Sequence, residues 1–285
     1  MKPKPVLLYG LYFLSALVFF ALVLFPEKEA AKGITNFVNQ ALGGVRLETD
    51  TAGTAFPAGL DLSGSRWTVF HFPPVKPETM RIDLSLTSLF SPLKDLTFKA
   101  KINQGQVRGN LRQVSFSGKE FASLDMDLSN IQVRNFPYQT DQYNMTLSFD
   151  AGGRYEYLKP QNSSRGSLIL LNFSTDLPGH PEAEKLGLSR MEFTRVELEF
   201  TMENKRIILT KCSARGPLMS LDMEGEVSTA EPLDIRLKGQ LNPGPSFVSK
   251  LSTLASVKDL FRGTPGKGIP ITISGTLRHP EIGFR

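Results

Sequence analysis

Cysteine and histidine are scarce in this chain, and each scarcity restricts its chemistry. Cys212 is the one cysteine among 285 residues, so no intramolecular disulfide can form and burial and strand pairing must hold the domain together. Cys212 ends the alternating run Ile207–Cys212, which is typical of a small buried side chain rather than of a nucleophile. The three histidines, His71, His180 and His279, lack the spacing of a metal site.

A strong charge of one sign is lacking too. The chain has 33 basic and 28 acidic residues and a formal net charge of +5, of which Lys2 and Lys4 supply two. The remaining excess is mild and evenly spread, which does not indicate a nucleic-acid surface. We therefore expect no nucleic acid among the partners.

Catalytic motifs are missing as well. No Gly-x-Ser-x-Gly nucleophile elbow is present. Asp125 and Asp127 resemble the Asp-x-Asp pair with which membrane-anchored glycosyltransferases hold a metal ion and a sugar nucleotide. They lie within the alternating segment Leu124–Leu128, however, where solvent-facing positions account for both carboxylates. We predict a non-enzyme with no catalytic residues, no cofactor and no metal, and keep a membrane-bound transferase as a minor alternative.

One long apolar run is present at the start of the chain. Val6–Phe25 contains no charge, Asn, Gln, His or Pro, and a helix of this length crosses the roughly 30 Å hydrocarbon core of a bilayer. A cleaved signal peptide is the alternative, but its apolar core is usually about 7–15 residues and ends at a small-residue cleavage site. The predicted membrane anchor consists of Val6, Leu7, Leu8, Leu11, Phe13, Leu14, Leu17, Val18, Phe19, Phe20, Leu22, Val23, Leu24 and Phe25.

The flanking charges predict an orientation and the domain boundaries. Lys2 and Lys4 precede the run without an acidic residue, whereas charges of both signs follow it. The positive-inside rule then predicts a cytoplasmic leader at 1–5, a transmembrane helix at 6–25 and the remainder outside the cytoplasm.

Helical spacing returns after this run. Segment 26–44 is predicted as a linking amphipathic helix that ends at Gly43-Gly44. It could lie on the membrane surface or cap the following sheet, and the mixed charges on its polar face favour capping. Ser246–Phe261 is predicted as a second amphipathic helix, with Ser246 as its N-cap.

From Val45 onward the apolar period changes to two. We predict roughly fourteen to sixteen strands, joined mostly as hairpins, in a β-rich domain over 45–285. Because no strand–helix–strand rhythm appears, the sheet is expected to be antiparallel with one apolar face. The candidates for this face are Ile82, Leu84, Leu86, Phe98, Leu124, Met126, Leu128, Leu221 and Met223. Two interpretations stay open: these residues form an open groove, or they form ordinary core between two layers.

The layout of these parts resembles a known family. An N-terminal span and a helix lead into Gly59–Arg66, amphipathic strands follow, and the chain closes with Gly268–Ile282, in which Gly-Thr-Leu follows a strand and precedes a proline. The chain resembles the type II secretion system protein N family in its AsmA-like, delta-proteobacterial form.

This resemblance implies a mainly β fold, in which an N-terminal transmembrane helix precedes an elongated, curved antiparallel sheet with a few amphipathic helices. It implies a single-pass protein of the bacterial inner membrane with its bulk in the periplasm. The expected function is a non-catalytic scaffold or assembly factor of a type II protein secretion system. The expected partners are the lipid bilayer and other secretion-system components. The alternative is a lipid-binding or lipid-guiding module whose apolar β-groove shields phospholipid acyl chains.

Overall fold

The computed structural model describes most of the β-rich region and part of the N-terminal region. The described residues are 12–13, 26–41, 45–55, 59–69, 74–84, 93–116, 119–139, 144–159, 163–176, 178, 189–203, 205–230, 233–245, 247, 268–276 and 279–284.

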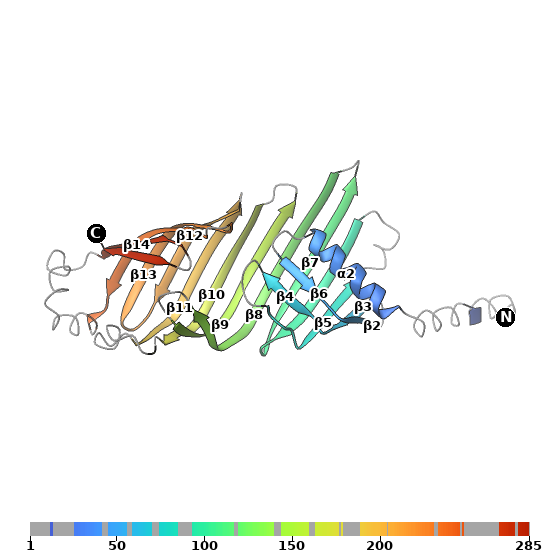
Figure 1. The fold of residues 1–285 in the computed structure, drawn as a ribbon, viewed down its shortest axis with the longest axis horizontal. Helices are drawn as coiled ribbons and strands as arrows, with labels where there is room; N and C mark the ends of the chain where they lie inside the picture. The colour runs from blue at the N-terminus through green and yellow to red at the C-terminus, as the bar shows by residue number, and fades with distance from the viewer. Residues whose placement is uncertain are drawn as a thin grey trace, which may run out of the picture.

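One antiparallel sheet of 14 strands forms the body of the molecule (Figure 1). From one edge to the other its strands follow the order of the chain. They are β2 (Thr51–Ala55), β3 (Gly59–Ser63), β5 (Thr79–Leu84), β6 (Leu93–Ile102), β7 (Gly105–Phe116), β8 (Lys119–Gln139), β9 (Asn144–Lys159), β10 (Ser163–Asp176), β11 (Arg190–Glu203), β12 (Arg206–Arg215), β13 (Met219–Ser228), β14 (Ile235–Pro243), β15 (Ile269–Gly275) and β16 (Pro280–Phe284).

Short turns make this order possible. Between β6 and β7 only two residues intervene, Asn103 and Gln104, and both have positive φ, 45° and 66°. Two successive positive φ values are the signature of the tight hairpin turn whose twist matches that of the strands it joins. Neighbours in the sequence therefore become neighbours in the sheet.

A helix and a two-stranded ribbon lie over the N-terminal strands. The ribbon pairs β1 (Val45–Glu48) with β4 (Arg66–Val69), and α2 (Glu27–Ala41) precedes it (Figure 1). Asn39 joins them, because its side-chain amide donates to the carbonyl oxygen of Leu47 at 3.1 Å and its oxygen accepts the Leu47 N–H at 2.7 Å. We call α2, β1 and β4 together the roof.

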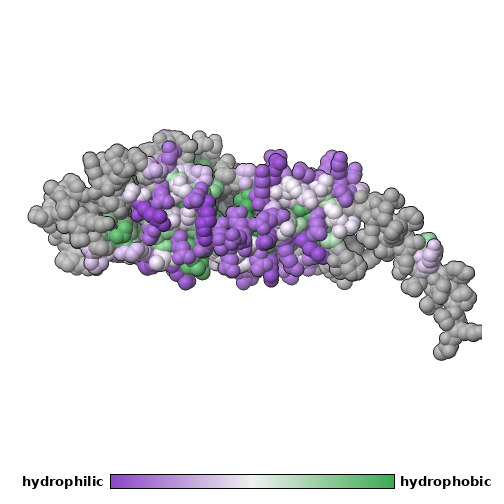
Figure 2. All heavy atoms as spheres, turned by 90° about the horizontal axis from the view of Figure 1, so that it is seen from below, coloured by the Kyte–Doolittle hydropathy of each residue, from purple (hydrophilic) through white to green (hydrophobic). Residues whose placement is uncertain are grey.

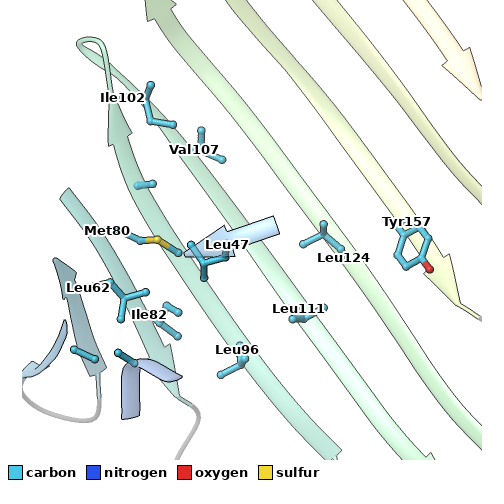
Figure 3. Packing of buried hydrophobic residues seen from close by; sticks show 13 residues of the cluster. Leu47, Leu62, Met80, Ile82, Leu96, Ile102, Val107, Leu111, Leu124 and Tyr157 are labelled. Atoms are coloured by element: carbon cyan, nitrogen blue, oxygen red, sulfur yellow. The ribbon is translucent and has the colours of Figure 1, made fainter. Parts of the chain in front are cut away.

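The main core lies between the roof and the first strands of the sheet (Figure 3). Ala31 of α2 and Leu47 of β1 are almost fully buried there. Across from them, the sheet contributes Leu62, Met80, Ile82, Leu96, Ala100, Ile102, Val107, Leu111, Leu124 and Tyr157. The helix predicted at 26–44 therefore caps the sheet with its apolar stripe.

A second cluster lies farther along the same face of the long strands. Ala151, Leu170, Val196 and Ala214 are buried in it. Three phenylalanines pack beside them: the ring centroids of Phe149 and Phe173 lie 6.0 Å apart, and those of Phe173 and Phe193 6.2 Å apart.

Asparagine residues mark irregularities in the long strands. Asn130, Asn135 and Asn172 have φ of 53°, 51° and 53°, a conformation that asparagine tolerates better than most residues. The pairing register shifts at each of them. Because a bulge adds one residue, apolar side chains such as Leu128 and Ile131 lie on the same face although they are three positions apart.

The predicted fold class is wrong in its helices, including the transmembrane helix. The mainly β, antiparallel part agrees with the structure, but no helix in the described ranges is both long and apolar enough to cross a membrane. The helix α2 has 15 residues and begins with the charged segment Glu27–Glu29, whereas a crossing needs about 20 apolar residues. The predicted transmembrane helix is therefore not supported. Of the predicted anchor Val6–Phe25, all but Tyr12 and Phe13 lie outside the described residues.

The expectation of several amphipathic helices is corrected in the same way. Within the described ranges, α2 is the one helix with assigned bounds. Apart from Phe247, the predicted helix Ser246–Phe261 lies outside the described residues.

Candidate apolar groove

A row of register partners crosses the apolar face of the sheet from β6 to β11. Residues that oppose each other in neighbouring antiparallel strands share a face, so the row can be followed strand by strand. In order it contains Phe98, Gly109, Met126, Tyr155, Gly166 and Phe200. Glycines on β7 and β10 therefore interrupt a row of large side chains.

The glycines shape this surface by leaving room for aromatic rings. A Cβ atom added at Gly166 would lie 2.5 Å from Cζ of Phe200, and one added at Gly109 would overlap Phe98. Each phenylalanine ring thus occupies the place where its partner's side chain would stand. The rings lie low over the sheet, and space remains above them.

This space is an apolar groove of about 370 Å³. Its roof side is formed by Val38 of α2, Leu47 of β1 and Trp67 of β4. The floor begins under the roof and continues beyond it to β10, β11 and β12, where Leu168, Phe200, Met202 and Ile207 line it. The groove therefore runs from the roofed part of the sheet towards its middle.

Trp67 of the roof lines the groove above this floor. Its ring meets Phe98 edge-on, with centroids 5.8 Å apart and an interplanar angle of 76°. Its indole N–H donates to the Met80 sulfur at 3.3 Å. As the only tryptophan of the chain, Trp67 provides an internal fluorescence reporter at the groove.

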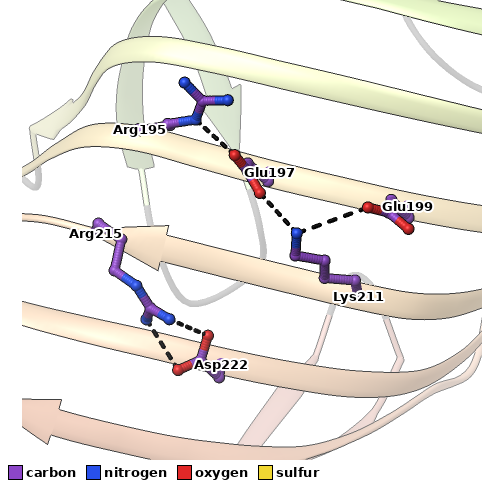
Figure 4. Close-up of polar contacts among 6 residues, drawn as sticks. All are labelled: Arg195, Glu197, Glu199, Lys211, Arg215 and Asp222. Carbon is purple, nitrogen blue, oxygen red and sulfur yellow. Dashed lines mark hydrogen bonds and ion pairs between the residues drawn. The ribbon is translucent and has the colours of Figure 1, made fainter.

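The opposite face of the sheet carries charged side chains that pair within a strand and across neighbouring strands. Figure 4 shows Glu197 between Arg195 and Lys211, with N–O distances of 2.6 and 2.8 Å, and Arg215 bound to Asp222 through two hydrogen bonds of 2.7 and 2.9 Å. The hydrogen bond from Lys211, with that from Arg195, lowers the pKa of Glu197, and the hydrogen bonds from Arg215 lower that of Asp222.

These pairs are typical of a solvated sheet face. Seen from below relative to Figure 1, the molecule presents mostly hydrophilic residues, with hydrophobic ones in separate patches (Figure 2). In the part of the chain that the structure describes, no three His, Cys, Asp or Glu side chains lie close enough to hold a metal ion. Asp127 faces Arg108 and Arg154 across its two neighbouring strands.

Cys212 lies on the apolar face, opposite Leu198 and Met223. Partial burial raises the pKa of its thiol. This agrees with a packing role for the side chain.

The structure brings five of the nine predicted face residues together at the groove. They are Ile82, Phe98, Leu124, Met126 and Leu128. Met223 is buried elsewhere on the sheet, and Leu221 packs against the second cluster. The backbone of Leu84 pairs with Leu96, and Leu86 lies outside the described residues.

Several groove residues were not predicted from the sequence. Trp67 lies in a strand of four residues, too short for alternation to show. Tyr155 and Phe200 lie in alternating segments that could have been included. The signal that was missed is the glycine opposite each of them, and reading it requires the strand register.

Comparison with protein-family models, with curated proteins and with solved structures finds no match for this chain. The resemblance to the type II secretion system protein N family therefore stays a prediction from layout and short motifs.

Proposed function

We propose that the protein binds an apolar chain, such as a phospholipid acyl chain, in the groove between the roof and the sheet. The observation that carries the proposal is the groove itself: its volume of about 370 Å³ lies within the range of ligand pockets, and nearly all its lining side chains are aliphatic or aromatic. Large contiguous apolar surfaces on proteins commonly mark interaction sites or ligand-binding grooves.

The energetics of burial favour such a ligand. Each methylene group moved from water into an apolar site gains about 0.8 kcal/mol, so eight methylenes gain about 6 kcal/mol. Association costs an estimated 4–15 kcal/mol, so a long chain is needed before binding becomes tight. A chain that follows the floor from the roof towards β11 satisfies this requirement.

The family resemblance supports a setting for this activity. It suggests a periplasmic component of a type II secretion system, where a shielded acyl chain could accompany assembly of the apparatus. No catalytic step is required of such a protein.

A scaffold function is the second candidate, and one observation favours it. β16 is the last strand of the sheet, and Ile282 on it is 55% exposed. Among the described residues β16 pairs with β15 alone, and a strand edge with an exposed apolar side chain can pair with a strand of another protein. Site-specific crosslinking from Ile282 would test this, and crosslinks to no secretion-system component would count against it.

Fluorescence of Trp67 tests the groove directly. A brominated phospholipid quenches tryptophan only at short range, so we expect saturable quenching in the intact protein. Leu128→Gln introduces a polar group into the groove lining and should weaken lipid binding about tenfold. Leu158→Gln is the matched control, because Leu158 is 50% exposed and lies outside the groove.

Circular dichroism must show that both variants are folded. Absence of saturable quenching in the unaltered protein would refute the proposal. Equal weakening by the two substitutions would place the lipid somewhere other than the groove.

A further inference from the structure

The larger polar side chains of the groove lining already have partners. The Trp67 indole N–H donates to the Met80 sulfur at 3.3 Å, and the Tyr155 phenol has the Ser164 hydroxyl as its partner. Arg154 forms an ion pair at 3.2 Å with a carboxylate of its own strand. Selection among apolar ligands must therefore come mainly from the shape of the groove.

The aliphatic side chains of the groove floor differ from those that strands usually carry. Strands favour side chains that branch at Cβ, such as valine and isoleucine, because these are stiff and pack well on a pleated surface. On the described floor Ile82 and Ile207 are of this kind, whereas the other aliphatic positions hold leucine or methionine. Most of the floor therefore consists of side chains whose first torsion is less restricted.

Three methionines line the groove, and two of them are free to adapt. Met80 is 5% exposed and its sulfur accepts the Trp67 N–H, so its position is fixed. Met126 on β8 and Met202 on β11 are only half-buried. An unbranched side chain with three rotatable bonds and a polarizable sulfur fills irregular gaps, and proteins use it on surfaces that accept varied partners.

The spacing of these two methionines matches the length of one acyl chain. From β8 to β11 are three strand spacings of about 4.8 Å, or about 14 Å in all. One leaflet is half of the roughly 30 Å hydrocarbon core of a bilayer, so one of its chains extends about 15 Å. A chain that follows the floor therefore passes both Met126 and Met202.

We infer that the groove binds straight and kinked acyl chains with nearly equal affinity, and that Met126 and Met202 are the side chains that adjust to the chain. The inference rests on the proposed function and defines its ligand class as the mixed acyl chains of membrane lipids. When a kinked chain enters, the two methionines change rotamer and fill the space beside the kink. The surrounding rings and isoleucines keep their positions.

Two lysophospholipids that differ only in chain shape provide the test. Oleoyl lysophosphatidylcholine has a cis double bond that kinks its chain, and elaidoyl lysophosphatidylcholine is its straight trans isomer. Each is titrated into the intact protein saturated with a brominated phospholipid, and recovery of Trp67 fluorescence measures displacement from the groove. The two affinities should agree within about threefold, whereas a hydrophobic pocket of fixed shape distinguishes ligands that differ by one methylene by about 10–200-fold.

Stiffening the floor should create selectivity. Met126→Ile combined with Met202→Ile keeps the apolar character and nearly the volume of both side chains but restricts χ1. Because a stiff floor can no longer move aside for a kink, this double variant should prefer the trans isomer about tenfold. Met191→Ile combined with Met219→Ile is the matched control, because both are half-buried methionines of the sheet outside the groove lining, and it should keep equal affinities.

The outcomes separate the two proposals. Absence of Trp67 quenching by the brominated phospholipid in the unaltered protein refutes the groove as a lipid site. Quenching that both isomers relieve, but with affinities about tenfold or more apart, refutes the adaptable floor alone. Equal affinities in a double variant that circular dichroism shows to be folded refute the role of the two methionines. If the double variant does not fold, each single substitution is measured instead and should give about a threefold preference for the trans isomer, and equal affinities in both single variants refute the same role.

Discussion

Replacing Gly166 by alanine tests whether glycines shape the floor of the groove. The added Cβ would lie 2.5, 2.9 and 3.1 Å from three atoms of the Phe200 ring, and these are its nearest neighbours. Carbon atoms normally approach to about 3.5–4.0 Å, so the ring would have to move by about 1 Å. Forced shifts of this kind in packed positions cost about 1–3 kcal/mol.

The same substitution should become favourable once the ring is removed. In a Phe200→Ala background the three closest contacts of the new methyl group are gone, and alanine in a strand is about 0.5–1 kcal/mol better than glycine. The double-mutant cycle should therefore give a coupling energy of about 1.5–4 kcal/mol, obtained from the cost of the clash and the gain without it.

Urea unfolding followed by circular dichroism measures each free energy of unfolding. Gly153→Ala serves as the control, because its Cβ would meet the backbone carbonyl oxygen of Ser167, which removal of Phe200 cannot relieve. An equal cost of Gly166→Ala with and without Phe200 would refute the reasoning. A cost at Gly153 that disappears with Phe200 would refute it too.

Two further substitutions test the roof and a charged contact beyond the groove. Asn39→Ala removes both hydrogen bonds to Leu47 and should lower the free energy of unfolding, measured by urea titration, by about 1–3 kcal/mol. Asn36→Ala, at an exposed position of the same helix, is the control and should change this free energy little. Asp150 accepts hydrogen bonds from Asn172 and Arg134, and these lower the pKa of its carboxyl group. The charged carboxylate therefore stabilises the fold above the unfolded pKa of about 3.9. This contribution is lost as the pH falls through the lower pKa of the folded state. The stability advantage over Asp150→Asn should therefore be constant above about pH 5 and shrink at lower pH, and an advantage that persists unchanged to about pH 2 would contradict this assignment.

The sheet could be predicted because one face is apolar along nearly every strand. Residues such as Ile82 and Leu124 alternate with polar neighbours, and a one-sided antiparallel sheet is the structure that this period specifies. Strict alternation fails at the bulges near Asn130 and Asn172, where one extra residue changes the phase.

The roof and the groove could not be predicted to the same degree. Whether Met126 is core or groove lining depends on what lies above it, and contacts between Trp67 and Phe98 or between Asn39 and Leu47 join elements by tertiary packing. The predicted transmembrane helix rested on the hydropathy and length of a single run, and no helix among the described residues is long and apolar enough to cross a membrane.

The position of the groove follows from the lengths of the two layers. At about 1.5 Å per residue, the 15 residues of α2 extend about 22 Å, whereas 14 strands at about 4.8 Å spacing extend roughly 60 Å. Even aligned with the sheet, this helix can cover only about a third of the apolar face. Phe98 lies under Trp67 and Phe200 lies farther along the floor, each close to a glycine, and the part of the floor that the described roof does not cover begins where this roof ends. An apolar chain that starts under Trp67 and continues past the roof would cover surface that the described roof leaves open.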